Sequence, residues 1–277
     1  MNNAADNAIV SKAVGIFSSF REVAAVGLSG SRTCDSADAE SDFDFVVLAK
    51  ETIPSARRRK HTYEKHHITE FPYFDADFEV CRGDGLTIDG VRCDTIWMRI
   101  PFVREFIASL DTKLDCDEFL PGGLLRTTPL FDPNGTLEAL KSEVPDYSRT
   151  RAVHRLKKHL SSAHFHIYVL RWFDKAALRN DYFCFFRHLR DAVEDFVTCL
   201  FALNRRWFCD EKRVIAVLRT LELAPRHTSE RLTSIITHED ENAELDKCLL
   251  NLKGLFNELS AIADVKYPGS EFPTDWK

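Results

Sequence analysis

Two aspartates two residues apart, Asp42 and Asp44, stand at the head of an apolar segment and have the spacing of metal ligands. The segment 43–49, FDFVVLA, predicts a strand, and residues two apart on a strand face the same way. The two carboxylates would then lie side by side while Phe43 turns into the core. Carboxylate oxygens suit Mg²⁺. Two such ions about 3.5–4 Å apart stabilise the attacking and leaving oxygens of phosphoryl chemistry, so the pair predicts that chemistry.

A two-metal site of this kind usually needs a third carboxylate on a neighbouring strand. Asp94 is the first candidate, because it lies in the middle of the alternating segment 91–98, VRCDTIWM. A lone acid among apolar neighbours is costly unless it has a role. Asp77 and Glu79, which share a face of the preceding predicted strand, are rivals, and we rank Glu79 second.

A turn, Gly30-Ser31, follows the short apolar run 23–28, VAAVGL, and is placed to meet phosphates. Gly30 would let the backbone approach a triphosphate. Ser31, at the start of a helix, would offer its hydroxyl and amide to phosphate oxygens. Arg32 either contacts the triphosphate or caps the loop, and we favour the first.

Basic residues elsewhere have two interpretations each. Arg206 and Lys212 follow a long predicted helix, where cations are favoured by the helix dipole. Alternatively, they reach the phosphates of the nucleotide, and both interpretations stay open. The basic run 57–60 indicates a solvated helix face or a path for an anionic acceptor.

The periodicity of the chain predicts the elements that would position these residues. Apolar residues recur at helical spacing over 4–20, and strict alternation over 73–80 predicts a half-buried strand. Residues 85–90, GLTIDG, are predicted as a turn. From 148 to 263 the pattern is helical. We therefore expect an α/β (α+β) core with a mixed sheet over residues 1–145, followed by an all-α helical bundle domain over residues 146–277.

The composition limits the class of protein. The chain has 277 residues and a formal net charge of −6, which disfavours nucleic acid as a partner because binding to nucleic acid depends on phosphate neutralisation. None of the eight cysteines forms a Cys-x-x-Cys pair, which favours reduced thiols. We see no signal peptide and no apolar run of the ~20 residues that span a bilayer. These features predict a cytoplasmic protein that does not enter a membrane.

The sequence resembles the polymerase β-type nucleotidyltransferase superfamily, and in particular its small bacterial aminoglycoside and lincosamide nucleotidyltransferases. Four segments carry the resemblance, and together they cover most of residues 20–135 and part of 180–215. They are GLSGSRTCDSADAESDFDFVVL, GVRCDTIWMR, PLFDPNG and LFALNRRWFCDEKR. The basic, histidine-containing helix between the predicted strands matches no specific subfamily.

The resemblance implies an enzyme that uses two Mg²⁺ ions and a nucleoside triphosphate, most often ATP, and releases pyrophosphate. Asp42, Asp44 and Asp94 would be the metal ligands and the catalytic acids. We expect the transfer of a nucleotide, AMP in most relatives, to a hydroxyl of a small molecule such as an antibiotic. The alternatives are a tRNA or protein acceptor, or a non-catalytic nucleotide-binding regulator. Monomer and homodimer are both compatible with the family.

Overall fold

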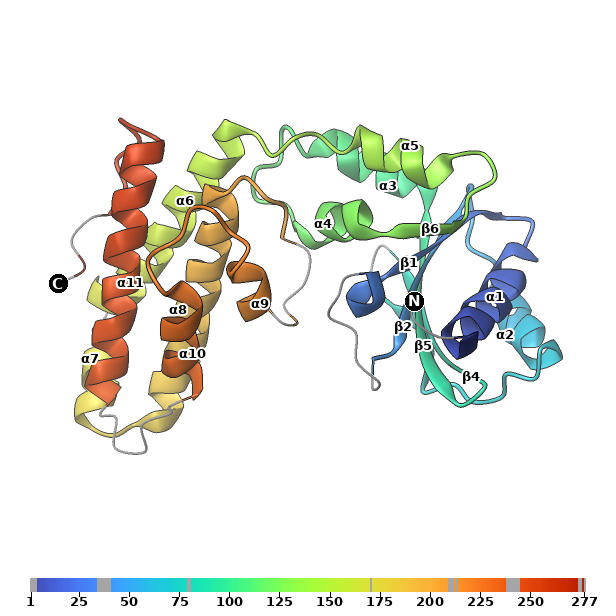
Figure 1. Cartoon of the computed structure of the whole chain (residues 1–277), viewed down its shortest axis with the longest axis horizontal. Coiled ribbons are helices and arrows are strands. Elements are labelled where there is room, and N and C mark those ends of the chain that lie inside the picture. Colours follow the sequence, from blue (N-terminus) through green and yellow to red (C-terminus); the bar gives the residue numbers. More distant parts are fainter. Residues whose placement is uncertain are drawn as a thin grey trace. The chain divides into compact units, whose positions relative to one another are not determined.

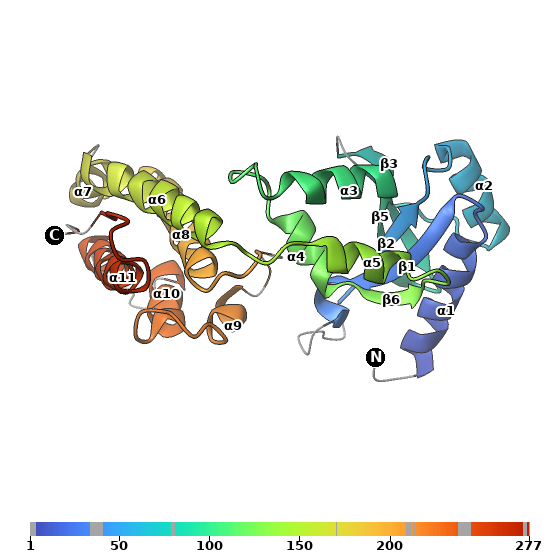
Figure 2. The same ribbon diagram turned by 90° about the horizontal axis from the view of Figure 1, so that it is seen from above.

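The computed structural model describes residues 4–33, 41–78, 81–169, 171–208, 212, 214–237, 245–273 and 276. The chain divides into two compact units. The first consists of Met1–Lys113 and Phe119–Pro145, and the second of Leu114–Glu118 and Asp146–Lys277. The first unit contains the sheet and the second is helical (Figures 1 and 2).

The first unit is built on a mixed sheet with the strand order β3-β4-β5-β2-β1-β6. Strands β2 and β5 run parallel, and the other neighbouring strands are antiparallel. The bounds are β1 Val23–Ser29, β2 Phe43–Ala49, β3 Tyr73–Asp77, β4 Arg82–Ile88, β5 Val91–Arg99 and β6 Thr128–Phe131.

Helices cover both faces of the sheet (Figure 1). Phe43, Phe45 and Trp97 alternate onto one face, where they pack with apolar residues of α1 and α2. Val46 and Met98 point to the other face, where they pack with α3, α4 and α5. The helix bounds are α1 Ala4–Ser18, α2 Ala56–Lys65, α3 Ile100–Ser109, α4 Phe119–Arg126 and α5 Thr136–Glu143. The alternation that predicted the strands therefore sorts their side chains into two cores.

The predicted turn over residues 85–90 is wrong, because β4 extends to Ile88 and only the last two residues turn. The sequence pattern did not indicate this strand because it contains two glycines and an aspartate, residues that are depleted in strands. The ring of Tyr73 covers Gly85, where an added Cβ would lie 2.7 Å from the ring. An aromatic side chain from the neighbouring strand thus supplies the packing that the glycine lacks.

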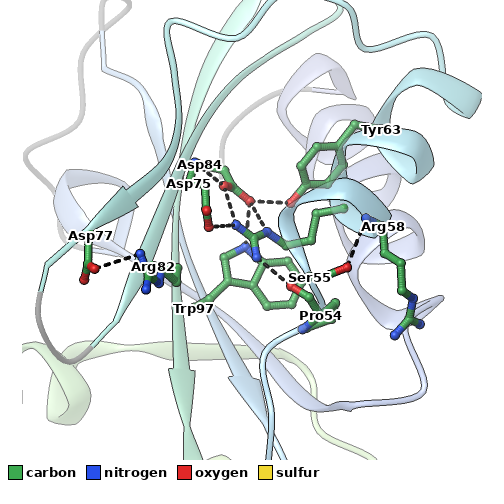
Figure 3. Close-up of polar contacts among 10 residues, drawn as sticks. Pro54, Ser55, Arg58, Tyr63, Asp75, Asp77, Arg82, Asp84 and Trp97 are labelled. Carbon is green, nitrogen blue, oxygen red and sulfur yellow. Dashed lines mark hydrogen bonds and ion pairs between the residues drawn. The ribbon is translucent and has the colours of Figure 1, made fainter.

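The aspartate of β4, Asp84, is completely buried and is the centre of a polar network (Figure 3). It accepts hydrogen bonds from Arg59 Nε at 2.9 Å, from the Tyr63 hydroxyl at 2.8 Å and from Trp97 Nε1 at 3.0 Å. Burial by itself would lower the pKa of Arg59, but its hydrogen bonds and attraction to Asp84 raise that pKa. The network joins α2 to β3, β4 and β5 around the buried ion pair of Arg59 with Asp84.

The second unit is a helical assembly in which α6, α8 and α11 carry most of the buried apolar side chains. The short segment Leu114–Glu118 belongs to it because Arg151 donates to the Leu114 carbonyl at 3.1 Å and the Tyr147 hydroxyl donates to Glu118 at 2.9 Å. The bounds are α6 Arg149–His164, a π-helical turn Phe165–Val169, α7 Trp172–Leu178, α8 Tyr182–Leu203, α9 Val214–Leu218, α10 Thr228–Thr237 and α11 Leu245–Lys266.

The expected fold class is confirmed: a mixed sheet with helices comes first and a mostly helical region follows. Within the parts of the chain that the structure describes, none of the helices has the length and hydrophobicity needed to cross a bilayer.

Candidate metal centre

A single row of paired residues crosses five strands of the sheet and carries two of the three predicted acids. Asp44 pairs with Asp94 across the parallel β2–β5 ladder, so their side chains leave the same face. The row continues on both sides through the pairs of Asp44 with Ser29, of Asp94 with Gly85, and of Gly85 with Tyr73. Because both residues lie on strands, the parallel register of β2 and β5 alone places Asp94 beside Asp44.

Asp42 completes the cluster from the residue before β2. Asp42, Asp44 and Asp94 each offer one carboxylate oxygen, and these oxygens lie within 4.8 Å of one another. All three side chains are partly buried, and Asp94 is 19% exposed. Three carboxylates at this separation repel one another, and a divalent cation would relieve that repulsion. The donor set consists of oxygens alone, which fits Mg²⁺ better than zinc.

Gly30 brings the backbone of the turn after β1 against Asp44. Its φ is +68°, in the left-handed region that favours glycine. A Cβ added there would lie 1.9 Å from Asp44 Oδ2 and 2.8 Å from Asp44 Cγ. The turn after β1 is therefore shaped around the Asp44 carboxylate, and only glycine fits.

We expect Gly30→Ala to weaken divalent-metal binding by about 10–100-fold, as loss of a supporting contact to a ligand does. The added methyl must displace Asp44, and the positive φ adds about 1–2 kcal/mol of strain. Isothermal titration with Mn²⁺ measures the first effect. Gly135→Ala is the matched control, since Gly135 has a φ of +65° but its added Cβ would meet nothing within 4 Å. Equal metal affinities in the two variants would contradict the close approach.

Ser31 and Arg32 lie in the turn Gly30–Thr33, which is a 3-10 helix rather than the start of an α-helix. The Arg32 guanidinium donates to the Ser41 carbonyl at 2.5 Å and to the Asp42 carbonyl at 3.1 Å. It also pairs with Asp6 at 3.2 Å and lies 3.9 Å from the centre of the Phe43 ring. These contacts tie Arg32 to the segment before β2, and its predicted contact with a triphosphate stays a prediction. Arg32 fixes the backbone that carries Asp42.

The sequence reasoning missed two residues beside the acids, Arg92 and Tyr73. Arg92 donates to both carboxylate oxygens of Asp94 at 3.2 Å, and these hydrogen bonds raise the pKa of Arg92. The two residues are two apart on one strand, so the spacing that paired Asp42 with Asp44 would have found Arg92. Burial, followed by the charge of Asp94, raises the pKa of Tyr73 to about 12. Tyr73 is therefore a neutral hydrogen-bonding group at neutral pH.

Of the two rival acids, Asp77 does not belong to the cluster. Asp77 forms an ion pair with Arg82 at 2.9 Å, and both side chains are exposed. Glu79 lies outside the described residues. Among the described residues, only the set of Asp42, Asp44 and Asp94 groups three potential metal ligands.

The predicted phosphate contacts of the helical half lie in the second unit. Arg206 donates to the Thr220 hydroxyl at 2.9 Å, and Lys212 is exposed. Their role in nucleotide binding stays a prediction. Asn204 ends α8 and ties it to Leu223 through two hydrogen bonds, one donated by its side-chain amide to the Leu223 carbonyl at 2.8 Å and one accepted from the Leu223 amide at 2.9 Å.

The basic run 57–60 is largely engaged in contacts within the first unit. Arg59 is 1% exposed in the Asp84 network, and Arg58 pairs with Glu22 through two hydrogen bonds. The hydrogen bond from Arg58 lowers the pKa of Glu22. The solvated-face interpretation of the run therefore does not describe Arg59, whose charge faces inward.

Comparison with known proteins adds little to this geometry. No family model matches the sequence, and no curated protein matches it. Among solved structures, a nucleotidyltransferase-like protein from Exiguobacterium sibiricum is similar over 94% of this chain and 78% of its own. The sequence identity is 10% and the TM-score 0.43.

Proposed function

We propose that this chain is a nucleotidyltransferase that transfers a nucleoside monophosphate, AMP in the first instance, from a triphosphate to an acceptor hydroxyl. The observation that carries the proposal is the convergence of Asp42, Asp44 and Asp94 beside the Gly30 turn. Three oxygen ligands, two on neighbouring strands and one directly before a strand, next to a glycine turn, are what a two-metal phosphoryl-transfer site requires. The sequence resemblance described above points to the same chemistry.

Asp42, Asp44 and Asp94 would hold the divalent cations. Bound Mg²⁺ would neutralise the charge that develops on the phosphoryl oxygens as the reaction proceeds. The acceptor oxygen forms a bond to the α-phosphorus, and the bond from that phosphorus to the bridging oxygen of pyrophosphate breaks. Asp94 would accept the proton of the acceptor hydroxyl.

The turn after β1 would hold the triphosphate. Gly30 makes room for the Asp44 carboxylate beside the turn, and Ser31 would donate hydrogen bonds from its hydroxyl and amide to phosphate oxygens. Arg32 would act indirectly, by fixing the segment that presents Asp42. Positioning and charge neutralisation are then the main sources of rate.

We propose a small hydroxylated molecule as the acceptor, and aminoglycosides and lincosamides are the first compounds to test. The net charge of −6 disfavours RNA, and Arg58 and Arg59 of the basic run are occupied by Glu22 and Asp84. A cationic acceptor such as an aminoglycoside would instead be attracted by the acidic chain.

The proposal is tested by incubating the full chain with Mg²⁺, ATP labelled at the α-phosphate and a panel of hydroxylated antibiotics. Transfer of the label to one compound, with release of pyrophosphate, is the expected result. Parallel reactions with total RNA and with protein lysate separate the macromolecular acceptors. If no acceptor in any of the three arms gains label with any of the four common triphosphates, the chain is not this enzyme.

A further inference from the structure

A pocket lies where β5 ends, beyond the acid cluster along that strand. It has a volume of about 310 Å³ and is lined by residues 52–56 with Arg59, Asp75, Arg82 and Arg99. Asp94 and Arg99 are five residues apart on β5, which places them about 16 Å apart along the strand. The pocket is therefore separate from the candidate metal centre, although both belong to the first unit.

Two of its arginines have guanidinium groups that a ligand could engage. Arg99 ends β5, is exposed, and forms no side-chain hydrogen bond or ion pair with the residues that the structure describes. Among the described residues, Arg82 pairs with Asp77 at 2.9 Å, and the two side chains are 39% and 60% exposed. An exposed pair of this kind contributes little, so Arg82 can exchange its partner.

The third arginine, Arg59, lines the pocket and is held in place by three neighbouring groups. Asp84 holds its Nε and Asp75 accepts from its Nη2 at 2.7 Å, while its Nη1 donates to the Pro54 carbonyl at 2.6 Å. The last contact fixes the loop that borders the pocket. The carboxylate of Asp75, the one acid among the lining residues, is already engaged by Arg59.

The start of helix α2 lines the same pocket through Ser55 and Ala56. Its first turn contains no acidic residue, and the Ser55 side chain caps it only through a long contact of 3.4 Å to the Arg58 amide. The first N–H groups of the helix and the positive end of its dipole therefore add to the positive charge of Arg82 and Arg99.

We infer that this pocket binds a phosphate group, either as inorganic phosphate or as a small phosphate monoester. Arginine forks match phosphate oxygens in pairs, and Arg82 and Arg99 lie on neighbouring strands at the pocket. The volume is near the lower limit of ligand pockets, roughly 300 Å³, which suits one phosphate with a short organic group. The site is an addition to the proposed nucleotidyl transfer and does not depend on it.

The test is a calorimetric titration of the full chain with inorganic phosphate and, separately, with glycerol 3-phosphate, in the presence of a metal chelator. Arg99→Ala and Arg82→Ala are each expected to raise the dissociation constant about tenfold, the loss of one charge-assisted contact. Arg104→Ala is the matched control, because Arg104 is an exposed arginine of the same unit whose partner is Glu143. Asp44→Asn serves as the control for the acid cluster.

The inference holds if phosphate or glycerol 3-phosphate binds to the unsubstituted chain and, of the four variants, only Arg82→Ala and Arg99→Ala weaken that binding. Binding of the ester alone would identify an organic ligand, and binding of both would show that the phosphate group suffices. The inference is overturned if neither ligand binds, if Arg104→Ala weakens binding as much as Arg99→Ala, or if Asp44→Asn abolishes it. Thermal unfolding of each variant shows that the fold is retained.

Discussion

Asp44→Asn is expected to lower the rate of nucleotidyl transfer by roughly 10²–10³-fold, the range seen when one stabilising group is removed from a transition state. The amide keeps the shape of the side chain but loses the charge that would hold a divalent cation. Asp44 is paired with Asp94 across β2 and β5 and touches the Gly30 turn, so its carboxylate is positioned by both neighbouring elements. Label transfer from ATP measures the rate, and Mn²⁺ titration measures metal binding independently of any acceptor.

The matched control for this variant is Asp111→Asn. Asp111 is an exposed acid in the same unit, outside the cluster, so its replacement removes the same charge without touching the candidate metal centre. We expect it to leave both readouts unchanged. If Asp44→Asn retains the activity of the unsubstituted chain, the role proposed for the cluster is wrong even if the chain is a transferase.

Asp84→Asn is expected to lower the free energy of unfolding by about 3–5 kcal/mol, because it leaves the buried guanidinium of Arg59 without its main counter-charge. Asp84 is 0% exposed and Arg59 is 1% exposed, so solvent does not replace the lost interaction. Domains are stable by only about 5–15 kcal/mol in total. The change should therefore appear as a large shift of the urea midpoint with little change in slope.

Asp77→Asn on the same hairpin is the control for burial. Asp77 and its partner Arg82 are 60% and 39% exposed. The free energy of unfolding of this variant should therefore fall by no more than about 1 kcal/mol. If the free energy of unfolding fell by similar amounts in the two variants, the buried ion pair of Asp84 with Arg59 would be no more stabilising than an exposed one. The network also matters for the candidate metal centre, because Asp84 precedes Gly85, the partner of Asp94.

The convergence of the acids was largely predictable from local pattern. Alternation placed Asp42 and Asp44 on one face of a strand, and the isolated position of Asp94 among apolar residues singled it out. The sequence did not show that β5 runs parallel to β2 with Asp94 opposite Asp44, because strand order is set by packing between distant segments.

Other features were hidden because their partners are far away in sequence. Arg59 stands in a basic run that looks solvated, yet its partner Asp84 lies 25 residues further along the chain. β4 was missed because its glycines and its aspartate are poor strand formers, and the rings and donors that compensate for them come from β3, α2 and β5. Local propensity fails where tertiary contacts supply what a residue lacks.

The most direct test of the central claim is a crystal structure of the chain soaked with Mn²⁺ and a non-hydrolysable triphosphate, with the metal located by anomalous scattering. We predict anomalous peaks bounded by Asp42, Asp44 and Asp94, with the triphosphate against the Gly30-Ser31 turn. A well-occupied nucleotide bound elsewhere, with no peak between these three carboxylates, would contradict the account.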